Sequence, residues 1–338
     1  MNRIILVSGN FDPANSYEYH NFLKPLENMG KEVMSFDFKK IMDEYGREQM
    51  NQKLLSFVKE HSPDLVIFVP QTNEFIPNII DAIGQHTLTL AYFFDDMWRI
   101  DFSRFWAQHY NFVTTSDVNG IKKFKEAGYE NVIYSPFACN TDFYCKKNLP
   151  KIYDVTFVGG FNPYREWYIN ILKKEGIDVK TWGIGWNTNM LSSEEMINVF
   201  NQSRINLNLS NNICWDIRYL LNNNRPIRKT LQIWKQSILA FKKSDFKSVE
   251  QVKGRHFEIN ACGGFQLSYY VEGLEKLYNI GEEISIYNSP YDLIQKVKFY
   301  LQNEDDREHI ALHGLERTLR EHQMKKRFEN IFEQINMK

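Results

Sequence analysis

The feature that most constrains the fold of this chain is a series of short, almost uninterrupted apolar runs separated by stretches with helical periodicity. The first run covers residues 3–9 (RIILVSG), and the next two cover 32–38 and 64–70. Later runs lie at 88–94, 111–115 and 131–136. Strands that are apolar at successive positions are buried on both faces, as in a parallel sheet covered by helices on each side. The pattern therefore predicts a doubly wound α/β domain.

The same pattern starts again after a polar connector at residues 141–152. An apolar run at 154–160 (DVTFVGG) leads into two glycines. It is followed by a helix, a strand, a helix and a strand at 164–175, 177–183, 192–202 and 205–209. Ser192 and Glu195 have the spacing of a capping box, which marks a helix start. A chain of 338 residues is long enough for two separate cores, so we predict two Rossmann-like domains.

The predicted domains cover residues 1–145 and 146–315, and a C-terminal helix at 316–338 is expected to pack back on the first domain. The segment 214–254 fits neither sheet, because nine Lys and Arg side chains lie there against three acidic ones, with aromatic residues between them. We interpret it as a basic helical insertion of the second domain. Such a segment is either a solvated surface or a binding surface, and the ligand of a binding surface would be a polyanion or an anionic lipid layer.

The overall charge and the termini narrow the class of protein further. The formal net charge is −1, which creates no general attraction to nucleic acid, and we expect no nucleic-acid partner. The four cysteines have neither metal-ligand nor disulfide spacing, which favours a reducing compartment. The N-terminus lacks an apolar stretch of signal-peptide length, and no run approaches the length of a membrane span. We therefore expect a cytoplasmic protein, with any membrane contact peripheral, at the inner face and through residues 214–254.

The densest motif lies at residues 255–287. A helix that begins near Arg255 and ends at Gly263 would carry Glu258 on its first turn. The amide groups at a helix N-terminus attract anions, and a carboxylate beside them can accept two hydrogen bonds from a ribose diol. This arrangement predicts a nucleotide site around Glu258.

This motif resembles the GT-B glycosyltransferases, specifically the group 1 C-terminal domain of spore-maturation CgeB-like proteins. The family pattern R-x-F-E-x-x-A-x-G, followed by G-x-E-I-x-x-Y, appears here as Arg255, Phe257, Glu258, Ala261 and Gly263, then Gly281, Glu283, Ile284 and Tyr287. The resemblance extends over about residues 153–335. It implies a GT-B fold of two Rossmann-like domains that face each other across a cleft. It also implies transfer of a sugar from a nucleotide-sugar donor to a glycan, lipid-linked or protein acceptor.

The resemblance also implies the donor-binding residues. Its opening strand and loop (residues 154–167) include Gly160 and Arg165, which would lie near the donor diphosphate. The other residues implied on the donor side are Lys253, Arg255, His256, Glu258, Gly263 and Trp186, the last beginning a loop at 186–191 that would contact the base. Glu250 lies eight positions before Glu258, which is the spacing of the Glu-x7-Glu signature of retaining enzymes. The sequence around Glu250 does not match that signature, so the stereochemical outcome stays open.

The acceptor side is predicted from topology alone. Asp95 and Asp96 follow the end of a predicted strand, where doubly wound folds gather their ligands. Either carboxylate could act as a general base or orient an acceptor hydroxyl group, and the alternative is that they cap the next helix. Asp12, in the loop after the first strand, is a third candidate.

The motifs that are missing from the sequence bear on cofactors. There is no Asp-x-Asp pair, so we expect a metal-independent enzyme in which cationic side chains neutralise the leaving group. No cofactor is expected, and the absence of a G-x-G-x-x-G motif after the first strand disfavours an NAD enzyme. Two other functions remain open: a nucleotide-sugar 2-epimerase of the same fold, and a non-catalytic protein that binds RNA or an anionic glycan through the basic insertion.

Overall fold

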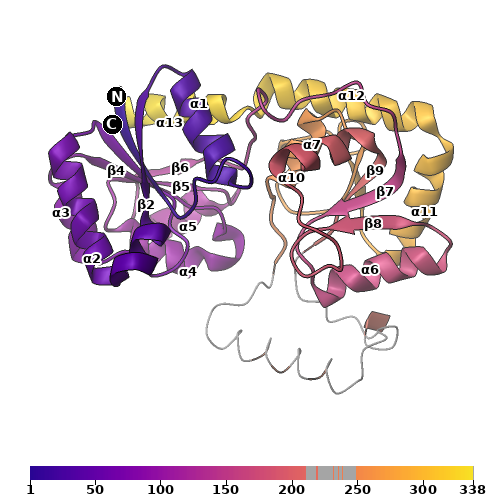
Figure 1. Ribbon diagram of the computed structural model, residues 1–338, viewed down its shortest axis with the longest axis horizontal. Coiled ribbons are helices and arrows are strands. Elements are labelled where there is room, and N and C mark those ends of the chain that lie inside the picture. Colours follow the sequence, from indigo (N-terminus) through magenta and orange to yellow (C-terminus); the bar gives the residue numbers. More distant parts are fainter. Residues whose placement is uncertain (211–217, 220–230, 232–234, 236–237, 239–248, 338) are drawn as a thin grey trace. The chain divides into compact units, whose positions relative to one another are not determined.

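The structure is a computed structural model that describes residues 1–210, 218–219, 231, 235, 238 and 249–337. The chain forms two compact units (Figure 1). Unit 1 consists of Met1–Phe143 and His322–Lys338, and unit 2 consists of Tyr144–Glu321. Most of the predicted basic insertion at 214–254, including Arg225, Arg228 and Lys229, lies outside the described residues.

Unit 1 is built on a parallel sheet of six strands in the order β2-β1-β3-β4-β5-β6. The strands are β1 (Arg3–Ser8), β2 (Glu32–Asp37), β3 (Leu65–Phe68), β4 (Leu88–Tyr92), β5 (Phe112–Thr115) and β6 (Val132–Tyr134). Each coincides with one apolar run of the N-terminal half. Because β1 pairs with β2 on one side and β3 on the other, the winding direction of the sheet changes between β1 and β3. The carboxyl ends of these two strands therefore form the crevice where this fold binds ligands.

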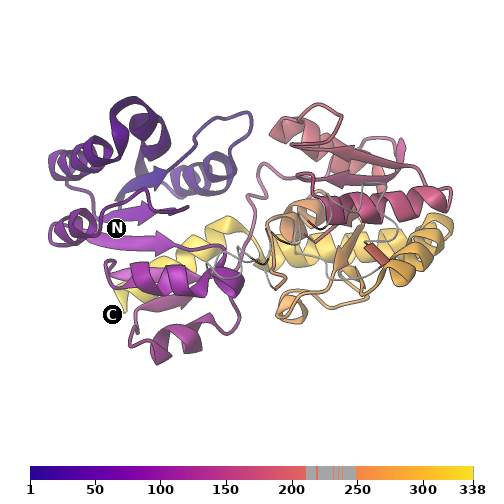
Figure 2. The same cartoon turned by 90° about the horizontal axis from the view of Figure 1, so that it is seen from below.

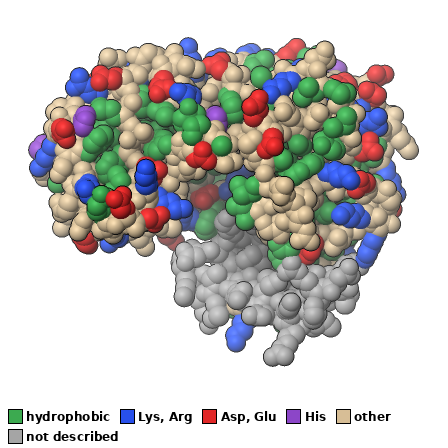
Figure 3. All heavy atoms as spheres, in the orientation of Figure 1, with side chains coloured by type: hydrophobic (Ala, Val, Ile, Leu, Met, Phe, Trp, Pro, Cys, Tyr) green, Lys and Arg blue, Asp and Glu red, His purple; other side chains and the backbone are tan. Residues whose placement is uncertain are grey.

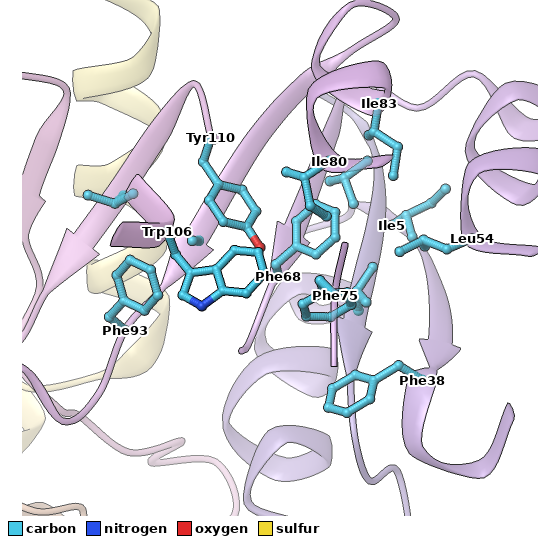
Figure 4. Packing of buried hydrophobic residues seen from close by; sticks show 14 of the residues in the cluster. Ile5, Phe38, Leu54, Phe68, Phe75, Ile80, Ile83, Phe93, Trp106 and Tyr110 are labelled. Carbon is cyan, nitrogen blue, oxygen red and sulfur yellow. The ribbon is translucent and has the colours of Figure 1, made fainter. Parts of the chain in front are cut away.

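Helices cover both faces of the unit 1 sheet because its strand residues are apolar at successive positions. Ile5 and Val7 pack with α2 (Phe38–His61), α3 (Pro77–Gly84), α4 (Asp96–Ala107) and α5 (Gly120–Glu126). Figure 4 shows part of this cluster, in which Phe93 lies beside Trp106. Ile4 and Leu6 pack on the opposite face with η1 (Tyr19–Leu23), α1 (Lys24–Asn28) and α13 (Met324–Asn336).

The first helices of unit 1 differ in extent from the periodicity of the sequence. The helical periodicity of residues 47–61 belongs to α2, which begins earlier, at Phe38, because the Asp37 carboxylate accepts a hydrogen bond from the Lys40 amide at 2.9 Å. It has a kink at Gly46, where φ is +81°. After β1 the chain becomes helical directly after Ser16, whose hydroxyl group accepts a hydrogen bond from the Tyr19 amide at 3.0 Å, and it continues into η1.

Unit 2 contains a second parallel sheet, with five strands in the order β11-β10-β9-β7-β8. The strands are β7 (Tyr153–Val158), β8 (Val179–Trp182), β9 (Ser203–Asn208), β10 (Gln266–Tyr269) and β11 (Ser285–Tyr287). The helices are α6 (Pro163–Lys174), α7 (Ser193–Gln202), α10 (Arg255–Ala261), η2 (Leu274–Lys276), α11 (Pro290–Gln302) and α12 (Glu304–Glu321). Helices α6 and α11 contact each other on one face, and α7 and α10 lie on the other (Figures 1 and 2). The winding direction changes between β7 and β9, which is the counterpart of the change in unit 1.

Two local signals of the sequence are seen directly in unit 2. The capping box at the start of α7 is complete, with Ser192 and Glu195 each bonded to the other's backbone amide. Helix α11 begins at Pro290, and the Ser289 side chain caps it by accepting from the Asp292 amide at 3.1 Å.

The end of the chain belongs to unit 1. The Met324 amide donates to the Cys139 carbonyl oxygen at 2.9 Å, and Arg327 Nε donates to the Pro136 carbonyl oxygen at 3.1 Å. Helix α13 then buries an apolar stripe against the sheet. None of the described helices is long and apolar enough to cross a membrane. On the face shown in Figure 3, acidic and basic side chains are interspersed over the described residues of each unit.

Candidate functional site

At the change of winding direction in unit 2, two glycine-containing loops lie in close contact. Gly159 and Gly160 follow the end of strand β7, and Gly183 follows the end of β8. A Cβ atom on Gly183 would lie 2.3 Å from the Gly159 carbonyl oxygen, and φ at Gly183 is +133°, so only glycine fits there. Trp186 Nε1 donates to the Gly159 carbonyl oxygen at 2.8 Å. The predicted base-contacting loop is therefore attached to the loop that follows β7.

Arg165 ties together the loops that follow β7 and β9. It lies on the first turn of α6, where the Asn162 side chain accepts its amide hydrogen bond at 2.9 Å. The guanidinium donates to the carbonyl oxygens of Gly160, Leu209 and Ser210 at 2.8, 3.0 and 3.0 Å. Burial lowers the pKa of Arg165. Its guanidinium thus fixes the backbone of the crevice and places a positive charge beneath it.

A second guanidinium lies on the same edge of the sheet. Arg255 begins α10, and its Nε donates to the carbonyl oxygen of Val158, the last residue of β7, at 3.3 Å. The Arg255 side chain is 32% exposed and forms an ion pair with Glu258, whose side chain is 1% exposed. Arg255 also interacts electrostatically with Arg165. The first turn of α10 therefore presents a cation to the crevice, and the Glu258 carboxylate holds that cation in place.

Glu250 lies on the same edge and is more accessible than Glu258. It is half-buried, and it accepts a hydrogen bond from the hydroxyl group of Ser210, two residues beyond the end of β9. It also interacts electrostatically with Arg165. The Glu-x7-Glu spacing thus brings one partly exposed and one buried carboxylate to this edge, although the sequence around Glu250 departs from the family pattern.

His256 and Gly263, both expected on the donor side, lie away from the crevice surface. His256 is fully buried, and its Nε2 lies 3.0 Å from Ser268 Oγ while its Nδ1 accepts from the Lys253 amide at 3.0 Å. Burial lowers the pKa of His256 to about 4, so the ring is neutral and cannot neutralise a phosphate. Gly263 follows the end of α10 with φ +62°, at the amino edge of the sheet where β10 begins. These two predicted donor contacts are therefore corrected: both residues shape the structure around α10.

Unit 1 has a pocket at the corresponding edge of its own sheet. Its volume is about 160 Å³, and it is lined by residues that follow three strands: Glu18 after β1, residues 69–71 after β3 and residues 93–95 after β4. Helix α4 closes the pocket with Arg99, Phe102 and Ser103.

The three predicted acceptor residues have different positions relative to this pocket. Asp95 lines it, and its side chain forms no hydrogen bond that caps α4. Asp96 is fully buried behind the pocket, where it accepts a hydrogen bond from Ser103 Oγ at 2.5 Å. Burial raises the pKa of Asp96 to about 7. Asp12 instead stabilises its own exposed turn by accepting from the Ala14 amide at 3.0 Å. Direct substrate contact by Asp96 is thus corrected, because its side chain is covered.

Glu18 also lines the pocket, although no motif in the sequence marks it. It lies in the helical turn directly before η1, ten residues after Ser8, and a carboxylate at that distance from a strand is not distinguished from any other polar residue.

Comparison with known proteins identifies the family and the fold of the chain. The model of the family described as "Glycosyl transferase-like" matches residues 165–333, which is half of the chain. Among solved structures, HepE from Anabaena in complex with UDP-glucose is similar with a TM-score of 0.68 and 9% identity over 100% of both chains. Sucrose-phosphate synthase from Thermosynechococcus elongatus has a TM-score of 0.66 and 9% identity, again over 100% of both chains. A glycosyltransferase from Rickettsia africae has a TM-score of 0.62 and 10% identity over 99% of this chain and 98% of that one.

At these identities the structural matches show the fold, which is the GT-B fold that the sequence predicts. No curated protein sequence matches the chain. The CgeB-like subfamily stays a prediction. The family match over residues 165–333 includes Arg165, Arg255 and Glu258. The chain therefore belongs to the glycosyl transferase-like family and has the GT-B fold.

Proposed function

We propose that this protein transfers a sugar from a nucleotide-sugar donor to a glycan, lipid-linked or protein acceptor. The observation that carries the proposal is the pair of guanidiniums, Arg165 and Arg255, beside the Gly159–Gly160 loop where the unit 2 sheet changes direction. A diphosphate binds where positive charge and accessible backbone coincide. HepE, one of the structures with this fold, binds UDP-glucose, which supports a uridine nucleotide as the first donor to test.

We assign the donor contacts as follows. Arg255, which is partly exposed, binds the diphosphate, and Glu258 positions Arg255 through their ion pair. Arg165 adds positive charge beneath the crevice, and its hydrogen bonds to Gly160 and Leu209 hold the loops after β7 and β9 together. Glu250 accepts hydrogen bonds from donor hydroxyl groups, and Lys253 lies close enough to Arg255 in the chain to add positive charge.

The proposed chemistry does not need a divalent ion. When the bond between the anomeric carbon and the phosphate oxygen breaks, negative charge develops on the diphosphate. Guanidiniums already in place stabilise that charge without reorganisation. We expect EDTA to leave the rate of nucleotide release unchanged. A rate that falls with EDTA and returns with Mg²⁺ or Mn²⁺ would contradict this part of the proposal.

The donor site is tested by calorimetry with UDP, GDP, TDP, CDP and their sugars. Arg255→Met should weaken binding of the preferred nucleotide by about 10- to 100-fold, because a charge-assisted hydrogen bond contributes about 1.5–3 kcal/mol. Since this variant leaves Glu258 unpaired, Arg255→Met with Glu258→Gln provides a second form without a buried charge. Arg204→Met is the matched control, because Arg204 lies at the amino end of β9 and pairs with Asp154 on the surface. Unchanged affinity in both Arg255 variants would refute the site.

Transfer and epimerisation are separated by the product. Transfer or donor hydrolysis releases free nucleoside diphosphate, whereas a 2-epimerase returns an altered sugar still attached to the nucleotide. We expect free nucleotide in a coupled assay with the preferred donor.

A further inference from the structure

The pocket of unit 1 has the walls of a sugar site. Three of its lining residues, Phe93, Phe94 and Phe102, supply apolar surface. Phe94 is held in place by Phe137, stacked at a centroid distance of 4.8 Å, and by Tyr17 edge-on at 5.8 Å. Rigid aromatic walls with a few polar groups among them are typical of sites that bind small ligands with one apolar and one polar side. A pyranose ring has both kinds of surface, in its C–H face and its hydroxyl groups.

The polar groups of the pocket are mainly acidic. Glu18 and Asp95 line it together with a single cation, Arg99, and the buried Asp96 lies directly behind Ser103. The Arg99 guanidinium already has partners within the protein. Its Nη1 donates to the Gln71 carbonyl oxygen at 2.7 Å, and its guanidinium carbon lies 4.0 Å from the centre of the Phe102 ring. An anionic ligand would therefore meet more carboxylate than guanidinium charge.

The surroundings of Glu18 leave its carboxylate able to accept a hydrogen bond from a ligand. It is half-buried, and its carboxylate accepts a long hydrogen bond from Ser16 Oγ at 3.4 Å and one from its own backbone amide. The described residues bring it no Lys or Arg partner at ion-pair distance. Burial raises the pKa of Glu18 above its ordinary value, which is the response of a carboxyl group that lacks a compensating cation. A hydroxyl or ammonium group of a ligand would supply the missing donor.

We propose that this pocket binds the acceptor sugar and that Glu18 is a specificity-determining residue, which selects neutral and amino sugars over phosphorylated sugars and uronic acids. The inference rests on the proposed function, because it assigns the acceptor side of the same reaction. The physical reason for the selection is repulsion between a second anion and the carboxylates.

The test is binding of monosaccharides to the full chain near neutral pH. Saturation-transfer NMR titrations with glucose, glucosamine, N-acetylglucosamine, glucose 6-phosphate and glucuronate give an affinity for each. We expect neutral and amino sugars to bind at least about tenfold more tightly than the two anionic ones, a difference of about 1.4 kcal/mol. In Glu18→Gln the preference for glucosamine over glucose should shrink, and the two anionic sugars should gain about three- to tenfold.

Two further variants make the result specific to the pocket. Phe102→Ala removes part of the apolar wall and should weaken all of the sugars, whereas Asp12→Asn, a carboxylate change outside the pocket, should weaken none. Circular dichroism confirms that each variant is folded. If Glu18→Gln proves unfolded, Asp95→Asn replaces it, with the same expected shift towards anionic sugars. Wild-type protein that binds no sugar, or that binds anionic and neutral sugars equally, overturns the inference, as does an unchanged profile in the substituted variant.

The failure of this inference is distinguishable from failure of the proposed function. Nucleotide binding at Arg255 is measured separately by calorimetry on the same samples. If the nucleotide binds and the sugar profile does not depend on Glu18, the acceptor assignment is wrong and the donor site stands. If no nucleotide binds, the proposed function is wrong, and the subsite then cannot be that of an acceptor.

Discussion

At the scale of single residues, a covered charge is stabilised by hydrogen bonds at the edge of the unit 2 sheet, whereas at the edge of the unit 1 sheet it is not. Arg165 is surrounded by carbonyl oxygens that accept its hydrogen bonds, so its charge is stabilised although it is largely covered. Asp96 accepts from Ser103, but its Oδ2 has no hydrogen-bond partner among the described residues. A buried carboxylate in that position is costly when ionised, and it takes up a proton instead.

Replacement of Asp96 by asparagine should change how stability depends on pH. In the folded protein Asp96 stays protonated up to about pH 7, whereas in the unfolded chain it ionises near its ordinary value of 3.8. Between these values the unfolded state binds fewer protons, so the free energy of unfolding falls as the pH rises. Asp96→Asn removes that loss and should stabilise unit 1 by up to about 4 kcal/mol more at about pH 8 than at about pH 4. Urea denaturation at both pH values measures this, and an equal effect at the two would contradict it.

Arg165 should be needed for stability as well as for binding. Lysine in its place cannot reach all three carbonyl oxygens, and a buried carbonyl left without a donor costs about 1–3 kcal/mol. We expect Arg165→Lys to lower the free energy of unfolding by about 3 kcal/mol and to weaken nucleotide binding. Arg204→Lys, which alters an exposed ion pair on the same sheet, should change neither. A variant with normal stability and weakened binding would instead make Arg165 a direct ligand of the diphosphate.

At the scale of elements, the crevice of unit 2 depends on how closely two loops approach each other. The loops after β7 and β8 touch at Gly159 and Gly183, and Trp186 fastens the second loop to the first. The α7 capping box, by contrast, stabilises one helix locally. A change in the contact between the two loops would therefore alter the site, whereas loss of the capping box would affect only α7.

Gly183→Ala should therefore damage the site, whereas Gly176→Ala should not. Both glycines have positive φ, so both substitutions strain the backbone by about 1 kcal/mol. Only at Gly183 would the new Cβ collide with another loop, at 2.3 Å, while nothing lies within 4 Å at Gly176. Thermal unfolding and nucleotide calorimetry on both variants check this. Equal losses of affinity would show that loop contact at Gly183 is unimportant.

The capping box offers a prediction confined to one helix. Ser192→Ala removes the side-chain acceptor for the Glu195 amide and should cost about 1 kcal/mol of stability. Nucleotide affinity should stay the same, because α7 lies on a face of the sheet and not at its carboxyl edge. A lowered midpoint of denaturation with unchanged calorimetry is the expected combination.

At the scale of the whole molecule, the two ends of the chain share one core. Helix α13 contributes Met324, Phe328 and Ile331 to the unit 1 cluster that also contains Ile4 and Leu6. Helix α13 thus covers part of one face of the unit 1 sheet.

Phe328→Ala should test how much unit 1 depends on α13. Phe328 is fully buried and packs edge-on against Phe22 at a centroid distance of 5.4 Å. Truncation of a buried phenylalanine costs about 3–5 kcal/mol. We expect lower stability of unit 1 with unchanged nucleotide affinity, since the proposed donor residues are all in unit 2. Equal thermal stability of variant and wild type would mean that α13 contributes little to the core.

The sequence by itself determined the strands, their approximate bounds and their repetition in two halves. These features depend on neighbouring residues: apolar runs such as residues 64–70, the capping pair at Ser192, and the proline at position 290. The R-x-F-E-x-x-A-x-G stretch likewise identified the edge of unit 2 where α10 begins, because its residues lie on one short helix and the turn after it.

Only the tertiary structure decided which side chains meet and which of them are exposed. Glu18, Gln71 and Asp95 come from three segments far apart in the sequence, and they share a pocket because the strands before them are neighbours in one parallel sheet. Likewise, burial of Glu258 and His256, and the engagement of Arg165 with carbonyl oxygens, result from packing across several elements. The chemical role of a charged side chain depends on its solvation and its partners, and long-range contacts establish both.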